Sequence, residues 1–360
     1  MSAMAMAKAL RTEYEIEFVL PAKSTLHSVV EAAGIVCHSL PMSELGRSWT
    51  RLLRYLPVLL HNTVRIRLLL CRRDIHLLVM NDYYNLLGVM SKCTGWRGQL
   101  LTMVRLLPLS QQLVLNWIWT ALALRFSSNV VAVSKAVAGQ LPASERVVTL
   151  YDPNNFGERH KNLEERQREG LVRCLYLANY IAGKGHEYGL QAFAWAYAQD
   201  STLRLRFVGG DMGLRKNRDL KAAILHSAVA MGLGDIVACD DYSKDVELDI
   251  KQADIVLNFS ESESFSMTCM EACAFGRPVI ATRCGGPEEI VDHGVSGLLV
   301  EVNDVQAMGE AILKLAKDQV LREAMGQAGH RIVRERFSND RFVEGWNKIV
   351  RTRRRKFTRS

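Results

Sequence analysis

The stretch IVLNFSESESFSMTCMEACAFGRPVIAT, residues 255–282, decides the fold of this chain. Its apolar run at 255–260 has the length of a buried strand, and PVIAT at 278–282 reads as a second one. Between them, residues 267–275 have the composition of a helix. A strand, a helix and a second apolar strand predict a parallel βαβ unit, because strands covered on both faces read as continuous apolar runs.

The same alternation extends along the whole chain. In the first half, the sequence predicts strands at 15–21, 35–40, 74–80, 98–104 and 129–134, and helices at 24–33, 48–71 and 83–94. In the second half, it predicts strands at 172–178, 203–209, 236–241, 255–260, 278–282 and 297–300, and helices at 187–199, 217–231, 267–275, 304–317 and 320–335. Strands that alternate with helices in this way predict an α/β fold with parallel sheets.

A chain of 360 residues is longer than one hydrophobic core usually serves, so we expect two domains. The stretch 152–170 is rich in charge and almost free of apolar residues, which is typical of a linker. The expected parts are an N-terminal domain at 1–151, the linker at 152–170, a C-terminal domain at 171–337, and a helix with a basic tail at 338–360. Ligands of doubly wound sheets bind beyond the carboxyl ends of the strands, near the cleft between two such domains.

Composition narrows the function classes. The net charge is +8, which suits a partner that carries phosphate. Eight scattered cysteines without a C-x-x-C pair fit a reducing compartment and give no zinc-finger spacing. The start of the chain does not read as a signal peptide. The longest apolar candidate, residues 113–126, is shorter than a membrane span and predicts a buried or interfacial helix.

Two glutamates in the opening stretch, Glu263 and Glu271, are candidates for ligand binding. On one continuous helix, residues eight apart lie roughly 12 Å apart along the axis, too far to meet on one small ligand. The geometry changes if Glu263 lies in the loop after the strand and the helix begins near 266–268. The helix N-terminus then favours a phosphate, and Glu271 can accept hydrogen bonds from a vicinal diol such as ribose.

The alternative is helix capping. Thr268 with Glu271, and Ser260 with Glu263, both have the spacing of a capping box, which needs no ligand. Spacing alone leaves both interpretations open.

Several motifs in order resemble one known family. They are LYLANYIAGKGHEYGLQAFA at 175–194, LRFVGGD at 205–211, the run from ADIVLNFS to SGLLV at 253–300, and the Phe337–Ser338 pair. Together they resemble the C-terminal domain of retaining family 4 glycosyltransferases, whose E-x7-E motif corresponds to Glu263 and Glu271. The resemblance covers roughly half of the chain and implies the GT-B fold, in which two doubly wound Rossmann-like domains face each other across a cleft. The first half matches loosely, mainly at 130–141 and 149–156.

The resemblance also implies roles for individual residues. Glu263 would lie at the transferred sugar, Lys184 would hold the diphosphate, and Glu271 would bind the ribose. The backbone amides of two residues would meet the phosphates, and a glycine pair would let its loop approach the ligand: these are Phe265, Ser266, Gly285 and Gly286. A fixed ammonium stabilises the leaving diphosphate, so the resemblance implies no metal and no cofactor beyond the nucleotide-sugar substrate.

The chain departs from the family pattern in four places. Asn179 stands where the family often has a second arginine clamp, and Ser266 stands where it often has glycine. Arg105 occupies the region where many members carry an acceptor-facing histidine. Residues 3–11 read as the first helix, so we expect the opening strand and its glycine-rich loop to be absent. His38 and His76 lie on strand patterns and are interpreted as structural.

Basic residues are concentrated in two segments. Residues 47–73 contain seven arginines and no acid, interleaved with leucine and aromatic residues, and the tail 351–360 adds six basic residues. Such an amphipathic, basic segment predicts peripheral contact of 47–73 with an anionic membrane surface; a solvated helix face is the alternative. No aromatic-studded motif indicates nucleic-acid binding.

Together with these observations, the resemblance implies a cytoplasmic, metal-independent retaining glycosyltransferase. It would move a sugar from a nucleotide-diphosphate donor to a glycan or lipid-linked acceptor, in the biosynthesis of bacterial surface polysaccharide such as lipopolysaccharide. One alternative is a nucleotide-sugar-binding protein without catalysis. A second, an NAD-dependent oxidoreductase, lacks a G-x-G-x-x-G after a strand with an acidic residue about 20 positions on.

Overall fold

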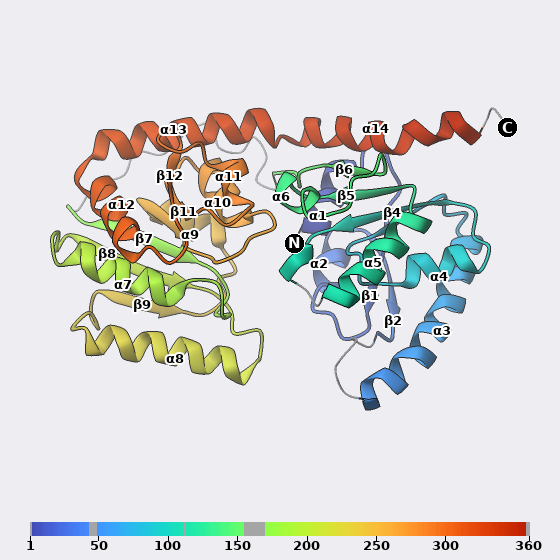
Figure 1. Cartoon of the computed structure of the whole chain (residues 1–360), viewed down its shortest axis with the longest axis horizontal. Coiled ribbons are helices and arrows are strands. Elements are labelled where there is room, and N and C mark those ends of the chain that lie inside the picture. Colours follow the sequence, from blue (N-terminus) through green and yellow to red (C-terminus); the bar gives the residue numbers. More distant parts are fainter. Residues whose placement is uncertain (1, 43–48, 111–112, 155–169, 358–360) are drawn as a thin grey trace. The chain divides into compact units, whose positions relative to one another are not determined.

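The structure, a computed structural model, describes residues 2–42, 49–110, 113–154 and 170–357 (Figure 1). The chain divides into two compact units: the first comprises Met1–Pro153 and Asn339–Ser360, and the second comprises Asn154–Ser338. Most of the predicted linker lies outside the described residues. The last helix groups with the first unit although it follows the second in sequence, which no sequence pattern indicates.

The second unit contains one six-stranded sheet in the order β12-β11-β10-β7-β8-β9. Its strands are β7 (Val172–Leu177), β8 (Leu203–Val208), β9 (Val237–Asp240), β10 (Ile255–Asn258), β11 (Val279–Thr282) and β12 (Gly297–Val300). All neighbouring pairs are parallel, which confirms the six predicted strands and the parallel sheet. From β7 the chain adds strands on one side and then returns to add β10, β11 and β12 on the other. The junction of β7 and β10 is therefore the topological switch point, where doubly wound sheets bind ligands.

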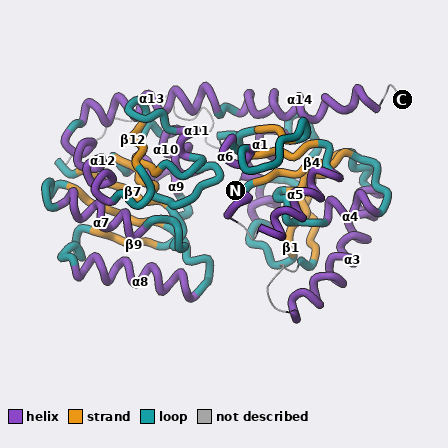
Figure 2. Tube along the Cα trace, in the orientation of Figure 1, coloured by secondary structure: helices purple, strands orange, loops and turns teal. Residues whose placement is uncertain are grey.

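Seven helices of the second unit are described: one follows each of the six strands, and α13 comes directly after α12 (Figures 1 and 2). They are α7 (His186–Tyr197), α8 (Arg215–Ala230), α9 (Val246–Gln252), α10 (Met267–Ala274), α11 (Pro287–Ile290), α12 (Val305–Lys317) and α13 (Gln319–Arg336). Four of them begin at a side chain that accepts a hydrogen bond from a first-turn amide, which stabilises a helix N-terminus. These N-caps are Asp245, Ser266, Asp304 and Asp318. The short helices α9 and α11 are missing from the sequence prediction because one or two turns give little periodicity.

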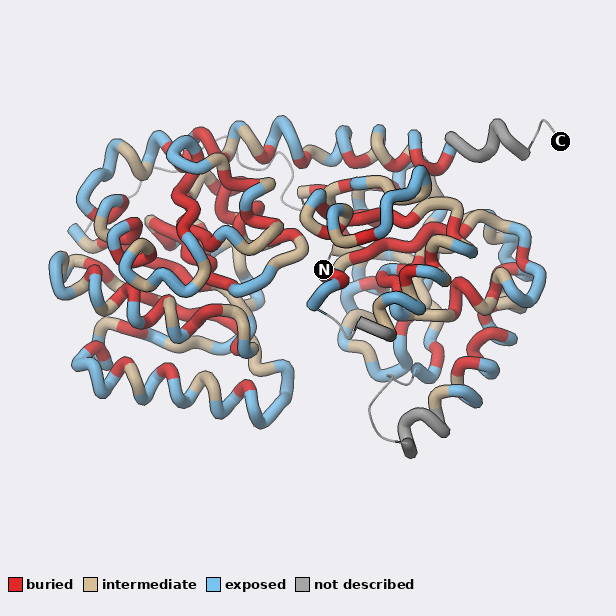
Figure 3. The backbone as a smooth tube through the Cα atoms, viewed as in Figure 1, coloured by how far each residue is buried: buried red, intermediate tan, exposed pale blue. Residues whose placement is uncertain are grey.

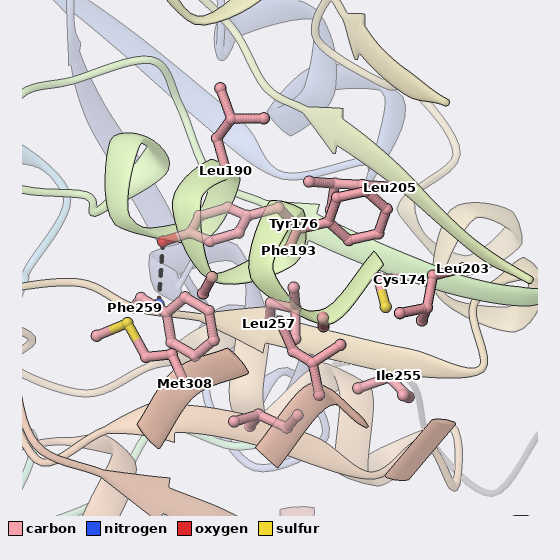
Figure 4. Close-up of a cluster of buried hydrophobic side chains, with 14 of the residues drawn as sticks. Cys174, Tyr176, Leu190, Phe193, Leu203, Leu205, Ile255, Leu257, Phe259 and Met308 are labelled. Atoms are coloured by element: carbon pink, nitrogen blue, oxygen red, sulfur yellow. Dashed lines mark hydrogen bonds between the residues drawn. The ribbon is translucent and has the colours of Figure 1, made fainter. Parts of the chain in front are cut away.

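The core of the second unit lies on the sheet under α7 and α12. Tyr176, Phe193 and Phe259 are all at most 1% exposed and lie in one cluster with the strand residues around them (Figure 4). Full burial of one such side chain contributes about 1.5–3 kcal/mol to the free energy of unfolding. The Tyr176 hydroxyl accepts a hydrogen bond of 3.0 Å from the Phe259 backbone amide, so its polar atom is satisfied.

The first unit contains two separate parallel sheets. One pairs β1 (Glu17–Pro21) with β2 (Val36–Leu40), and the other has the order β3-β4-β5-β6. The strands of the larger sheet are β3 (Leu77–Met80), β4 (Gln99–Val104), β5 (Asn129–Ala132) and β6 (Val147–Thr149). The five strands predicted for this half are confirmed, and β6 is added. Figure 3 shows that buried residues are concentrated on β4 and β5.

The described helical segments of the first unit are α1 (Ser2–Leu10), α2 (His27–Ala32), α3 (Trp49–Arg72), α4 (Leu87–Cys93), the 3-10 turn η1 (Pro108–Ser110), α5 (Leu113–Phe126), α6 (Lys135–Ala138) and α14 (Asn339–Phe357). The helices expected at 3–11 and 113–126 are confirmed. The Tyr14 hydroxyl donates to Asn347 Oδ1 at 2.6 Å, which attaches α14 to the start of the chain. Within the described ranges, no helix combines the length and the apolar character needed to cross a bilayer.

Candidate functional site: the switch point of the second unit

Two charged residues that are 79 positions apart meet at the switch point. Lys184 follows β7 and Glu263 follows β10, and because these strands are neighbours in the sheet, both loops leave the same edge. The Lys184 Nζ donates to Glu263 Oε1 at 2.8 Å, and the Ser260 hydroxyl donates to the same oxygen at 2.8 Å. The side chains are 30% and 14% exposed, respectively, so the pair is half-buried and still contacts solvent.

The backbone of the Lys184 loop is fixed against β10. The Tyr176 hydroxyl donates to the Lys184 carbonyl at 2.6 Å while it accepts from the Phe259 amide. Gly185 has a φ of 70°, and a Cβ at this position would lie 1.9 Å from the Phe259 carbonyl oxygen. Only glycine permits this approach, and it holds the ammonium at one place relative to the end of β10.

His186, the first residue of α7, lies beneath this loop. Its ring stacks on Tyr180 with centroids 5.1 Å apart, and burial lowers its pKa to about 4. His186 is therefore neutral at physiological pH and adds no charge beside Lys184. Sequence reasoning missed this residue, whose packing role depends on aromatic partners from several strands.

The helix after Glu263 begins at Met267, with Ser266 as its N-cap. The Ser266 hydroxyl accepts from the Cys269 amide at 3.3 Å and from Asn258 Nδ2 at 2.7 Å. Both capping boxes considered for the glutamates are therefore wrong. Thr268 instead donates to the Leu177 carbonyl at 3.1 Å. The Ser260 hydroxyl does bond Glu263, but the helix starts several residues later.

The glycine pair brings a second loop against the same residues. The Glu263 amide donates to the Cys284 carbonyl at 3.1 Å, and the Gly286 amide donates to the Glu263 carbonyl at 2.8 Å. Gly285 has a φ of 118°, a conformation that favours glycine. A Cβ on Gly286 would lie 2.5 Å from Phe265 Cα and 2.9 Å from the Ser266 amide nitrogen, so a larger residue would displace this backbone.

Phe265 is itself 7% exposed, and its ring packs on Phe337 with centroids 5.6 Å apart. Its side chain thus anchors the loop in the core of the second unit. Only the backbone of Phe265 is then left to contact a ligand. Phe337 is half of the phenylalanine–serine pair that the sequence analysis singled out, which gives that motif a structural reason.

Glu271 lies one turn into α10, apart from the Lys184–Glu263 pair. Burial raises the pKa of Glu271 to about 7, because desolvation disfavours its ionised form. A ligand that donates hydrogen bonds to the carboxylate would lower this pKa again. The structure thus separates the two glutamates: one is a loop residue paired with a lysine, and the other is a half-buried helix residue.

Asn179 lies at the same edge, where it follows β7. Its Oδ1 accepts a 3.0 Å hydrogen bond from the amide of Gly210, which follows β8. The side chain is exposed and ties two loops of the strand edge together. A cavity of about 480 Å3 is lined by Ile181 and Ala182 of the Lys184 loop and by residues of α8.

Arg105 belongs to the first unit, where it follows β4. Its guanidinium forms an ion pair with Asp152 and donates from Nε to Asn81 Oδ1 at 2.9 Å and from Nη2 to Met6 Sδ at 2.8 Å. The side chain of Arg105 is 13% exposed and that of Asp152 is 3% exposed. Arg105 therefore connects β3, β4, α1 and the segment after β6 within its own unit.

Asp82, next to Asn81, is a further buried carboxylate that sequence reasoning missed. Burial raises its pKa to about 6, although the Tyr83 amide donates to it at 2.9 Å. Two polar residues directly after the apolar run of β3 are a signal that could have pointed to this strand end.

The two histidines interpreted as structural differ from each other. His38 Nε2 lies 2.7 Å from Glu17 Oε2, across the β1–β2 pair, which confirms a structural role. His76 is mostly exposed and lies 3.7 Å from Asp74. Among the residues that the structure describes, no three His, Cys, Asp or Glu side chains are grouped so as to hold a metal ion.

Comparison with known proteins identifies the second unit. Residues 159–332 match the family of group 1 glycosyl transferases. The chain is 36% identical over 100 residues to the N-acetyl-alpha-D-glucosaminyl L-malate synthase of Bacillus anthracis, and 32% identical over 168 residues to the D-inositol 3-phosphate glycosyltransferase of Saccharomonospora viridis. The matches cover 28% and 45% of this chain but only 26% and 38% of those relatives.

The fold likeness extends over nearly the whole chain. The crystal structure of Anabaena Alr3699/HepE in complex with UDP and glucose superimposes with a TM-score of 0.81, and the alignment covers 97% of this chain and 96% of that one. At 17% identity this likeness concerns the fold. Residues 159–332 therefore match a group 1 glycosyl transferase domain, and the chain has the GT-B fold that the sequence predicts.

Proposed function

We propose that this chain is a retaining glycosyltransferase that uses a nucleotide-diphosphate sugar. The observation that carries the proposal is the Lys184–Glu263 pair, half-buried at the switch point of the family-matched unit. An ammonium and a carboxylate at this place, next to the N-terminus of α10, suit a ligand with both a diphosphate and a sugar.

Each residue at the strand edge has a role in this proposal. Lys184 holds the diphosphate together with the Phe265 and Ser266 amides, and Asn179 is a weaker polar contact in place of an arginine. Gly285 and Gly286 admit the ligand close to the backbone. Glu271 accepts hydrogen bonds from the ribose, and the cavity beside Ile181 leaves room for the nucleoside.

The proposed transfer reaction depends on the charge that develops on the leaving group. The bond between the sugar and the diphosphate breaks, negative charge develops on the leaving phosphate, and Lys184 stabilises it at a fixed position. The acceptor hydroxyl attacks from the side that the leaving group occupies, and its proton passes to the leaving phosphate oxygen. Glu263 lies at the transferred sugar. The ammonium supplies the positive charge that other transferases take from a metal, so the reaction is proposed to be metal-independent.

The acceptor is proposed to be a hydroxyl of a glycan or lipid-linked glycan in bacterial surface polysaccharide biosynthesis, including lipopolysaccharide. The first unit would present this acceptor, with Arg105 positioning the loops after β3 and β4. The proposed location is the cytoplasm, with peripheral contact of residues 47–73 with an anionic membrane surface and no nucleic-acid partner.

A thermal-shift screen of UDP- and GDP-sugars tests the donor class. A ligand that binds only the folded state stabilises it by about 2.7 kcal/mol at a concentration of 100 Kd. We expect one nucleotide series to raise the melting temperature, and the Glu263→Gln variant to retain that shift. Transfer is then measured as the release of nucleoside diphosphate after an extract that contains the acceptor is added. No shift with any nucleotide would contradict the proposal, and a shift without transfer or donor hydrolysis would identify a binding protein instead.

A further inference from the structure

Helix α3 exposes a continuous row of aliphatic side chains. Leu56, Leu60, Val64 and Leu68 are 59%, 57%, 60% and 49% exposed. They are spaced four residues apart, and at 100° per residue each lies about 40° further around the helix than the one before. The row is therefore one stripe along the outer face of α3, and it extends for three turns of the helix.

A different face of α3 already packs in the core of the first unit. Leu59, Ile66 and Leu70 are at most 9% exposed and belong to one buried cluster with Met80 and Leu100 of the larger sheet. A surface helix normally places charged and polar residues opposite its buried stripe. In α3 the outer stripe is aliphatic instead, so packing within the unit does not account for it.

Arginines flank this stripe. Arg72 continues the four-residue row directly after Leu68, and Arg65 follows Val64; both are exposed. Residues 47–73 contain no aspartate or glutamate. Two other arginines of the segment have partners within the unit: Arg67 donates to the Thr94 carbonyl, and Arg73 lies 3.4 Å from Glu17 Oε1. The outer face thus combines an aliphatic stripe with positive charge at its border.

From this arrangement we infer that the outer face of α3 is a membrane-docking surface, which lies flat on anionic lipid with Leu56, Leu60, Val64 and Leu68 among the acyl chains. Arg65 and Arg72 contact the headgroups. Aliphatic side chains enter the boundary between headgroups and acyl chains, while basic residues attract the anionic leaflet. This inference deepens the proposed function, because it names the residues and the manner by which the transferase would meet a lipid-linked acceptor.

A second copy of the chain fits this surface less well. A two-fold contact through α3 would bring the same face of both copies together. The arginines of one copy would then lie near those of the other, without acidic residues in the segment to compensate. An anionic lipid surface satisfies both the stripe and the charge.

Flotation of the full chain with lipid vesicles tests the inference. The vesicles are phosphatidylcholine alone or phosphatidylcholine with phosphatidylglycerol in equal parts. We expect the wild type to float with the anionic vesicles, and the Leu60→Glu/Val64→Glu variant to bind them at least about tenfold more weakly. Arg65→Gln/Arg72→Gln should weaken binding as well and reduce its dependence on salt. The matched control is Val229→Glu/Val320→Glu, which changes two residues of the second unit that are 60% and 76% exposed, and it should float like the wild type.

Three outcomes would overturn the inference: equal flotation with and without phosphatidylglycerol, equal flotation of the α3 variant and the control, or an oligomer in gel filtration that only the α3 variant abolishes. The last outcome would assign the face to a second copy. The thermal shift with the nucleotide sugar is measured on each variant. If the wild type shows the thermal shift but does not float, only the docking surface is rejected. If the wild type shows no thermal shift with any nucleotide sugar, the proposed function is rejected.

Discussion

A cation and a carboxylate meet at the carboxyl ends of parallel strands in both units, but the two pairs differ in how much of them is left accessible. Arg105 and Asp152 of the first unit are 13% and 3% exposed, and the guanidinium also bonds Asn81 and Met6. Lys184 and Glu263 of the second unit are 30% and 14% exposed. The Arg105–Asp152 pair is buried and has the features of a structural contact. The Lys184–Glu263 pair is exposed enough to be reached by a ligand. The same kind of ion pair can therefore have a structural role in one unit and a binding role in the other.

The largest effect on stability is expected from breaking the Arg105–Asp152 ion pair. Arg105→Met leaves Asp152 buried and unpaired, and removal of one partner of a buried ion pair costs about 3–5 kcal/mol of unfolding free energy. Urea denaturation measures it. Arg218→Met is the control, because Arg218 is 57% exposed and its contact with Asp211 is 3.5 Å long, so its loss should cost under about 1 kcal/mol.

One outcome would contradict a structural role for Arg105. If Arg105→Met has native stability and unchanged donor binding but loses transfer, then the arginine contacts the acceptor directly.

The next effect concerns catalysis. Lys184→Ala should lower kcat by about 10²–10³-fold, since it removes a preorganised stabiliser of the leaving phosphate. Its unfolding free energy should fall by only about 1 kcal/mol, because the pair still contacts solvent. Initial rates of nucleotide release measure the change. Lys221→Ala is the matched control: this lysine pairs with Asp241 at 2.6 Å in the same unit and should leave the rate unchanged.

The third prediction concerns Glu271 and pH. Its pKa is raised to about 7 in the folded state, so the folded protein binds this proton more tightly than the unfolded chain does. Glu271 therefore makes the unfolding free energy fall as pH rises from about 4.5 to 7, and the penalty is complete above that range. Glu271→Gln should remove this fall in denaturation curves taken across the range.

The same variant should bind the nucleotide about tenfold more weakly, because a hydrogen bond to a charged group is lost. A variant that keeps full nucleotide affinity would show that Glu271 does not contact the ribose.

The smallest effect is expected at the helix cap. Ser266→Ala should cost at least about 1 kcal/mol of unfolding free energy, because it removes the cap and the acceptor of Asn258 Nδ2, and it should weaken nucleotide binding slightly, because Ser266 begins the helix at the proposed phosphate site. Asp304→Ala removes the cap of α12, where Asp304 accepts from the Ala307 amide at 2.9 Å. It should cost about 1 kcal/mol of unfolding free energy and have no effect on nucleotide binding. Equal nucleotide affinity in both variants would count against a phosphate at α10.

The sequence predicts the second unit better than the first, and the reason is physical. Strands such as 255–258 are buried on both faces, so their apolar runs are unambiguous. The three residues of β6 are too short to stand out from the loops around them. The separation of β1 and β2 from the larger sheet depends on strand pairing over long distances in the sequence, which periodicity does not report.

In the candidate site, too, some contacts follow from the sequence and others do not. The resemblance predicts Lys184 and Glu263 as parts of one site, and the structure brings them within hydrogen-bonding distance. The spacing of Thr268 and Glu271 left a capping box open as an alternative, yet Thr268 donates to the Leu177 carbonyl, which comes from another strand. The partner of Arg105 is 47 residues away and equally invisible to local patterns.

The central claim is that the Lys184–Glu263 pair belongs to a donor site, and calorimetric titration with UDP and GDP tests it most directly. Wild type and the Lys221→Ala control should bind one of these nucleotides with the same Kd. Lys184→Ala should bind that nucleotide about 10- to 100-fold more weakly, as expected for a charge-assisted contact with phosphate. Equal affinity of all three proteins for the nucleotide would contradict the account and leave the pair as a structural contact.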